Sequence, residues 1–189
     1  SRRRHTRYGT VTGVQTCALP ILAKHKGRLF LDGLTTLSDK AAEALAKNGA
    51  GLSLDGLTTL SDKAAEALAK HEGYLFLDGL TTLSDKAAEA LAKHKGGAIV
   101  LRGLTSLSDK QAEALAKHEG YLALDGLTTL SDKAAEALAK HKGRLFLDGL
   151  TTLSDKAAEA LAKNGADLDR KSTRLNSSHS SVSRMPSSA

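Results

Sequence analysis

Between Leu22 and Leu168 the chain contains no cysteine, proline, methionine or tryptophan. Without cysteine, this stretch can form neither a disulfide framework nor a cysteine-based zinc site, and its redox compartment stays undefined. No apolar run reaches the roughly 18 residues that a membrane-spanning helix needs, so we expect no membrane insertion. The absences therefore exclude disulfide-rich, zinc-cysteine and membrane-spanning classes for this part of the chain.

The basic character of the chain comes from its two ends. The net charge of +6 would suggest a nucleic-acid partner, because a basic surface attracts phosphates. Residues 1–21 and 169–189, however, contain 8 of the 27 basic residues and one of the 21 acidic ones. The remaining stretch has 19 basic and 20 acidic residues, a net charge of −1. We therefore expect no nucleic-acid partner.

The two ends are related to each other at the level of DNA. Ser1–Ile21 can be written in codons whose reverse complement translates, without a mismatch, as Asp169–Ala189. Two segments selected for their own folds would not show this relation. The ends are therefore an inverted repeat in DNA, and their amino acids are a by-product of it.

The DNA implied by these ends resembles the adapter of high-throughput sequencing libraries. VTGVQTCALPI and DRKSTRLNSSH resemble its two strands in translation, SRRRHTR and SRMPSSA its outer part, and Tyr8–Thr10 with Ser180–Val182 a sample barcode. The resemblance covers 42 of the 189 residues. It implies that 1–21 and 169–189 are not native and should be set aside before the fold is considered. The terminal inverted repeat of a transposon is the alternative. Residues 22–168 are then a fragment of a longer reading frame.

The stretch between the ends is a tandem repeat. A consensus of L-x-L-D-G-L-T-T-L-S-D-K-A-A-E-A-L-A-K-H-x-G-x occurs six times, and its central glycines recur at spacings of 23, 23, 24, 23 and 23 residues. These glycines are Gly33, Gly56, Gly79, Gly103, Gly126 and Gly149. A short fixed period with leucines at constant places predicts a solenoid.

Each repeat begins with a predicted strand. In the first copy, Leu29–Leu31 alternates with period two, which places the two leucines on one face and Phe30 on the other. Asp32-Gly33 should turn the chain, and Leu34–Leu37 should continue extended with both leucines inward. We expect Leu31, Leu34 and Leu37 to be buried.

Each repeat ends with a predicted helix. Asp39–Lys47 is rich in alanine, and Ser38 or Asp39 should cap it. A narrow stripe of Ala41, Ala44 and Leu45 should face inward, whereas Lys40 and Glu43 should be exposed. The glycine that follows the helix should end it in the left-handed conformation.

These elements predict an α/β fold, a right-handed solenoid of 23-residue strand–turn–helix repeats with one parallel sheet and one helix per repeat. The L-x-L segments over residues 22–168 resemble those of irregular bacterial leucine-rich repeats. The asparagine of the family's L-x-x-L-x-L-x-x-N-x-L segment is absent, so an asparagine ladder cannot be assumed. The array opens and closes inside a repeat, without capping repeats, so we expect its ends to self-associate.

Two columns of polar residues are candidate metal sites. A histidine recurs in five copies and is replaced by Asn48 and Asn164 in two others; it could bind a transition metal or cap the helix end. Asparagine suits only the second role.

An aspartate recurs before the central glycine, except in the fourth repeat, where Arg102 replaces it, and it could bind calcium or make the turn. Arg102 should relieve repulsion between Asp78 and Asp125. The histidines are His25, His71, His94, His118 and His141, and the aspartates are Asp32, Asp55, Asp78, Asp125 and Asp148. We expect no metal and no cofactor.

The positions where the repeats differ are the candidate binding residues. Two columns vary, one in the middle of L-x-L and one just before it, and both should face outward. Their large members are Arg28, Phe30, Tyr74, Phe76, Tyr121, Arg144 and Phe146. Aromatic and arginine residues are enriched in protein-binding hot spots. Drift after duplication is the other explanation.

We expect no catalysis, because serine, histidine and aspartate recur alike in every copy, whereas a catalytic site is one asymmetric constellation. The predicted function is a protein-binding interaction module that uses the sheet face. The alternatives are a structural spacer or cell-surface array without a specific ligand here, with an enzyme domain elsewhere in the parent left open.

Overall fold

The computed structural model describes residues 27–163 as six strands that alternate with six helices. The segments assigned to adapter, together with His25 and Asn164, lie outside the described residues. The strands are β1 (Leu29–Phe30), β2 (Leu52–Ser53), β3 (Leu75–Phe76), β4 (Ala98–Val100), β5 (Tyr121–Ala123) and β6 (Leu145–Phe146). The helices are α2 (Asp39–Leu45), α3 (Asp62–Leu68), α4 (Asp85–Leu91), α5 (Asp109–Leu115), α6 (Asp132–Leu138) and α7 (Asp155–Ala162).

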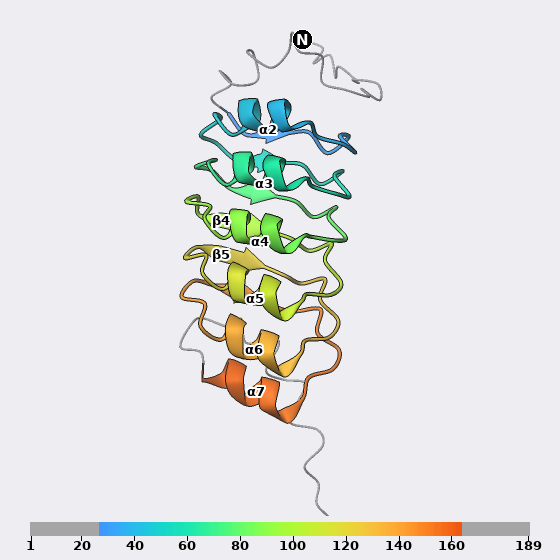
Figure 1. The fold of residues 1–189 in the computed structure, drawn as a ribbon, viewed down its shortest axis with the longest axis vertical. Coiled ribbons are helices and arrows are strands. Elements are labelled where there is room, and N and C mark those ends of the chain that lie inside the picture. The colour runs from blue at the N-terminus through green and yellow to red at the C-terminus, as the bar shows by residue number, and fades with distance from the viewer. Residues whose placement is uncertain (1–26, 164–189) are drawn as a thin grey trace, which may run out of the picture.

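The strands form one parallel sheet in chain order, β1 to β6, and equivalent residues of successive repeats lie side by side. Leu29 pairs with Leu52, Leu52 with Leu75, and Leu75 with Ile99, so the extra residue of the fourth repeat falls outside the strands. Figure 1 shows the resulting stack, with each helix directly below the preceding one. The predicted α/β solenoid is confirmed.

A serine begins every helix, and the next repeat reinforces it. The Ser61 side chain accepts a hydrogen bond from the Ala64 N–H, as the equivalent serines do, so serine rather than aspartate is the cap. The Ser61 hydroxyl also donates to the carboxylate of Asp39 in the preceding repeat at 2.6 Å. Equivalent serine–aspartate bonds join the later repeats. The helix starts therefore form a continuous hydrogen-bonded column.

The buried face of the helices is wider than the predicted stripe. Ala41, Ala42 and Leu45 are buried in α2, whereas Ala44 is half-buried there. Equivalents of all four are buried in α3, α4 and α6. The predicted stripe did not include Ala42, which is buried because each helix also packs against the helices of neighbouring repeats. Helices α2 to α6 end at the leucine, two residues before the position of the predicted Lys47, and α7 ends one residue later, at Ala162.

Of the three predicted inward columns of Leu31, Leu34 and Leu37, two lie in the core and the third is only partly covered. Leu34 and its equivalents are buried, and so are the equivalents of Leu31 from the second repeat onward, whereas Leu31 itself is half-buried rather than buried as predicted. The prediction of a buried Leu37 is wrong, because Leu37 and its equivalents are half-buried and Leu153 is 40% exposed. This column lies where the chain leaves the sheet for the helix, so fewer side chains surround it. Lys40 and Glu43 are exposed as predicted.

The glycines are needed for close approach between repeats. A Cβ on Gly79 would lie 2.1 Å from the Asp55 carbonyl oxygen, and one on Gly73 would lie 2.0 Å from that of Ala50. Neither glycine, nor Gly49 after the first helix, has a φ in the left-handed region, so the predicted left-handed helix ends are wrong. Glycine is required because a backbone passes where a Cβ would be.

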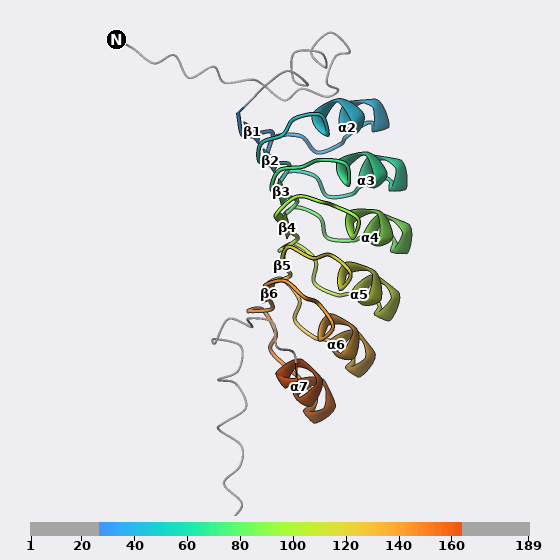
Figure 2. The same cartoon turned by 90° about the vertical axis from the view of Figure 1, so that its left-hand side faces the viewer.

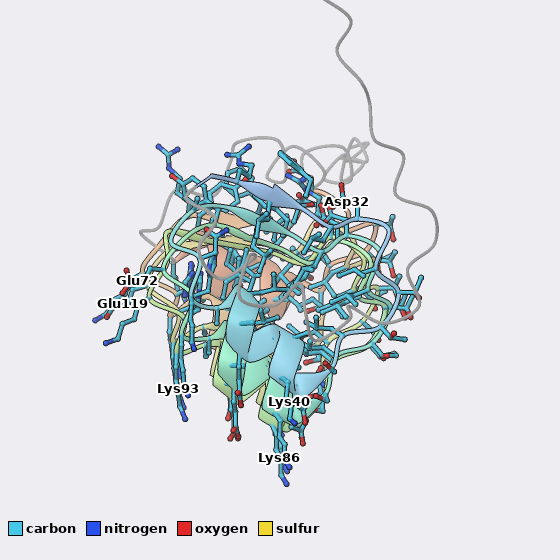
Figure 3. All side chains as sticks on the ribbon, turned by 90° about the horizontal axis from the view of Figure 1, so that it is seen from above. Asp32, Lys40, Glu72, Lys86, Lys93 and Glu119 are labelled. Atoms are coloured by element: carbon cyan, nitrogen blue, oxygen red, sulfur yellow. The ribbon has the colours of Figure 1, made fainter. Side chains whose placement is uncertain are left out.

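The solenoid is an arc. Figure 2 shows the sheet along its concave side and the helices along its convex side. In Figure 3, Lys40 and Lys86 extend from the helix side, Asp32 lies toward the sheet, and Glu72 and Glu119 extend from a third side. None of the described helices is long and apolar enough to cross a membrane.

Candidate functional site

The concave face of the sheet carries all the predicted binding residues. Strand pairing aligns the residue before each strand in one column and the outward strand residue in a second column. Phe30 is 65% exposed and Tyr74 49%, and both arginines are exposed. Phe76, Tyr121 and Phe146 are half-buried. The structure therefore brings the seven residues onto one face and divides them into two groups.

The first group, which we call the first aromatic cluster, consists of Arg28, Phe30, Tyr74 and Phe76. The guanidinium carbon of Arg28 lies 5.9 Å from the ring centroids of both Phe30 and Phe76, within cation–π range. Arg28 reaches the second ring by crossing β2 at Gly51, where a Cβ would lie 3.0 Å from the arginine Nε. Because Gly51 has no side chain, it leaves room for the side chain of Arg28.

The second aromatic cluster consists of Tyr121, Arg144 and Phe146. The rings of Tyr121 and Phe146 stack with centroids 4.6 Å apart, across neighbouring strands. Between the two clusters lies a floor of small buried residues, Ala98, Val100 and Ala123. Large side chains lie next to small ones along these columns, so their variation has a packing basis that drift alone does not predict.

A column of aspartates borders the aromatic face at the carboxyl ends of the strands. Asp55 Oδ1 accepts a hydrogen bond from the Asp78 N–H at 3.1 Å, and Asp78 Oδ1 accepts one from the Arg102 N–H at 3.1 Å. Asp125 accepts one from the Asp148 N–H at 3.3 Å. The aspartates therefore do more than make turns, because their carboxylates tie each repeat to the next. The sequence offered calcium binding or a turn as alternatives for these aspartates, and this ladder was not among the predictions because only an asparagine ladder was considered.

Arg102 interrupts the aspartate column as predicted. Its Nε donates to Asp125 Oδ2 at 2.9 Å, and its Nη1 lies 3.6 Å from Asp78 Oδ2. The hydrogen bond to Asp125, with the charge of Asp78 beside it, raises the pKa of the guanidinium. The expected relief of repulsion between the two carboxylates is confirmed.

Ser53 links the first two aspartates of the same column, Asp32 and Asp55. Its buried hydroxyl contacts Asp32 Oδ1 and lies 2.9 Å from Asp55 Oδ2. A hydroxyl has one hydrogen, so it can donate to only one carboxylate at a time. Asp32 and Asp55 therefore share one proton donor where Asp78 and Asp125 share a guanidinium. This contact could not be predicted from the repeat pattern, because Ser53 stands where three of the other repeats have phenylalanine.

The histidine column is buried in the turn after each helix. His71, His94, His118 and His141 are 0–4% exposed, and their rings stack with centroids 5.9–6.3 Å apart. The Nε2 atoms of His94 and His141 lie 3.0 Å from the carbonyl oxygens of Gly73 and Gly120. Each of these carbonyls belongs to the preceding repeat. His94 and His141 therefore do not cap their own helices, contrary to the prediction.

Asn48 shows the same role without a titratable group. Its Nδ2 donates to the Gly27 carbonyl at 3.2 Å, also in the preceding repeat. Burial lowers the pKa values of His71 and His94, and it lowers that of His118 to about 4 with the help of the adjacent imidazoles. Over residues 27–163, no group of three or more histidine, aspartate or glutamate side chains could hold a metal ion.

An open cavity of about 550 Å³ lies on the helix side, near the ends of α2 and α3. Its charged lining residues are Glu43, Lys47, Lys70 and Glu72, so it presents both signs of charge. No predicted binding residue lines it, and the concave face remains the candidate site.

Comparison with known proteins adds no relative. No protein-family model matches the chain, and no curated protein sequence is similar to it. The function is therefore inferred from the concave face itself.

Proposed function

We propose that this repeat array is a non-enzymatic interaction module that binds a protein partner on the concave face of its sheet. One observation carries the proposal. Parallel sheets are normally covered on both faces, yet within residues 27–163 helices pack on only one face of this sheet. The uncovered face exposes Phe30 and Tyr74, the two most exposed large hydrophobic side chains of the described residues.

The first aromatic cluster suits binding better than the second. Its rings are more exposed, and Arg28 holds two of them in place, so little side-chain freedom remains to be lost when a partner binds. Aromatic and arginine side chains at the centre of an interface contribute much of its free energy. The stacked pair of Tyr121 and Phe146 stabilises the array and would form the second half of the footprint.

The test compares the chain with its Phe30→Ser/Tyr74→Ser variant. Ser53 occupies the Phe30 position in β2, so the fold accepts serine there. We expect the variant to lose the partners that the wild-type chain captures in a pull-down, while Leu153→Ser keeps them. Leu153 is a suitable control because it is 40% exposed but lies off the concave face. Identical captured proteins for all three would instead favour a spacer without a ligand on this stretch.

A further inference from the structure

We propose that the concave face takes a protein segment in which an arginine or lysine neighbours an aromatic or aliphatic residue. The basic side chain binds Asp32 and Asp55, and the apolar one packs on Phe30 and Tyr74. The inference rests on the proposed function and adds the chemistry of the partner.

Arg102 provides the pattern for the basic side chain. It lies in the aspartate column and pairs with carboxylates of the repeats on either side, at 2.9 and 3.6 Å. Asp55 and Asp32 occupy the same column two and three repeats earlier, and strand pairing keeps the same register there. They belong to neighbouring repeats, about 5 Å apart, whereas Arg102 spans carboxylates of the repeats on its two sides. One guanidinium or ammonium group from outside can therefore contact both Asp32 and Asp55.

The charges at this end of the column are not balanced. Within residues 27–163, no cation forms an ion pair with Asp32 or Asp55, and the two carboxylates share the Ser53 hydroxyl. Arg28 directly precedes β1, at the end opposite to Asp32, and is held there against Phe30 and Phe76. A partner with a positive side chain is thus electrostatically complementary to this edge of the face.

The aromatic side chains lie at the right distance for the neighbouring apolar residue. Phe30 precedes Asp32 by two residues on the same face of the chain, a separation of roughly 7 Å along a strand. Adjacent or alternate side chains of a bound segment span a similar distance. One segment can therefore place its cation on the carboxylates and its apolar side chain on Phe30, with Tyr74 beside it.

The experiment selects peptides from a displayed library of random 12-residue sequences on the full chain. Three variants are compared, Asp32→Asn/Asp55→Asn, Asp39→Asn/Asp62→Asn and Phe30→Ser/Tyr74→Ser. Asparagine keeps an Oδ1 acceptor, so the first variant removes charge but retains the bond from the Asp78 N–H. The second removes the same charge from the helix starts, where the aspartates accept hydrogen bonds from serine hydroxyls. Circular dichroism confirms that each variant is folded.

We expect the selected peptides to be enriched in arginine or lysine next to an apolar residue. Their affinity should fall about fivefold or more in Asp32→Asn/Asp55→Asn, fall with added salt, and stay unchanged in Asp39→Asn/Asp62→Asn. Peptides without basic enrichment, or basic peptides that bind Asp32→Asn/Asp55→Asn equally well, would overturn the inference. If those peptides still require Phe30 and Tyr74, the proposed function stands. No enrichment over Phe30→Ser/Tyr74→Ser would overturn both.

Discussion

At the scale of single residues, the smallest side chains set the distance between repeats. Gly79 and Gly73 lie against carbonyl oxygens of the preceding repeat, and the alanines let neighbouring helices approach each other. Leucines then fill the space between the sheet and the helices. A larger residue at a glycine position would push two repeats apart and open that core.

Gly79→Ala should therefore destabilise the array. Its Cβ would lie 2.1 Å from the Asp55 carbonyl oxygen, and such overpacking costs about 1–3 kcal/mol. Gly33→Ala is the matched control, because it has the same sequence context but nothing within 4 Å of the added Cβ. Urea unfolding should show the loss for Gly79→Ala alone; equal effects at both positions would refute the close-approach argument.

Leu77→Ala should cost about 2–5 kcal/mol, from lost transfer free energy and the cavity that remains. Leu77 is fully buried in the third repeat, where the repeats on both sides leave little room for collapse. Chemical denaturation of the variant gives the value. A change within experimental error would contradict the position of this leucine in the core.

The inward leucines could be predicted from the sequence because alternation along a strand is a local property. Leu34 and the equivalents of Leu31 from the second repeat onward were assigned correctly in this way, whereas Leu31 itself is only half-buried. Ala42, Gly79 and Ser53 were not, because their roles depend on how near the next repeat lies. That distance is a property of two repeats together, and the sequence of one repeat does not contain it.

At the scale of elements, each helix is too short to be stable alone. Most have seven residues, well below the roughly 12–15 at which isolated helices become even marginally stable in water. Their stability must come from packing and from the serine column at their starts. From Ser61 onward, each serine both caps its own helix and donates to an aspartate of the previous repeat.

Ser84→Ala tests this double role. It removes the bond from the Ala87 N–H and the contact with Asp62, so we expect a loss of about 1–2 kcal/mol. Ser38→Ala should cost less, because Ser38 caps α2 but donates to no carboxylate among the described residues. Thermal unfolding of the two variants gives the difference. Equal losses would mean that the serine–aspartate bonds contribute nothing.

The order of strands and helices was predictable, but the helix ends were not. The start of α2 follows from a serine before an acidic, alanine-rich segment. Its end was placed at Lys47 with a left-handed glycine, whereas the helix stops at Leu45 and the chain continues through tight turns. The buried residue of the next turn, Asn48 or a histidine, fixes this path by bonding to the preceding repeat, which no local pattern reveals.

At the scale of the whole molecule, position in the array determines burial. Arg28–Lys47 and Arg144–Lys163 have the same sequence, yet equivalent residues differ. Leu31 is half-buried and Leu147 only 2% exposed, because the fifth repeat pairs with the sixth and packs beside Leu147. The repeats therefore supply each other's core, as expected for a solenoid.

Removal of residues 1–21 and 169–189 should leave the array intact. These segments match no repeat, and the resemblance to adapter implies that they were never selected with it. We expect the chain of residues 22–168 to retain its circular dichroism spectrum and cooperative unfolding. Loss of cooperativity after trimming would contradict the domain boundaries.

The histidine column, which runs through four repeats, should make the array sensitive to acid. Burial lowers the pKa values of His71, His94 and His118 below the unfolded value of about 6.5. The unfolded chain then binds more protons than the folded chain below that pH. The stabilisation is complete above about pH 6.5 and is lost as the pH falls toward the folded values, about 4 for His118.

The charged groups around the column should alter this trend little, since they are exposed. They are Lys70, Glu72, Lys93, Lys95, Lys117, Glu119, Lys140 and Lys142. At pH 5.5 His118 should cost about 1 kcal/mol of folding stability, because that pH lies one unit below the unfolded pKa but above the folded one, and His71 and His94 should add to this loss. Carboxylates titrate mostly at lower pH, so the interval from pH 7.5 to 5.5 isolates the imidazoles.

The variant to compare is His71→Asn/His94→Asn/His118→Asn. Asn48 already occupies this position and bonds to the preceding repeat, so the fold accepts the substitution. Urea midpoints of the wild-type chain should fall steadily from pH 7.5 to 5.5, whereas those of the variant should change little, whatever its stability at neutral pH. The dependence of the urea midpoint on pH must differ between the two proteins if the stacked imidazoles take up protons only on unfolding. Equal slopes would show that the buried histidines are protonated within the folded array.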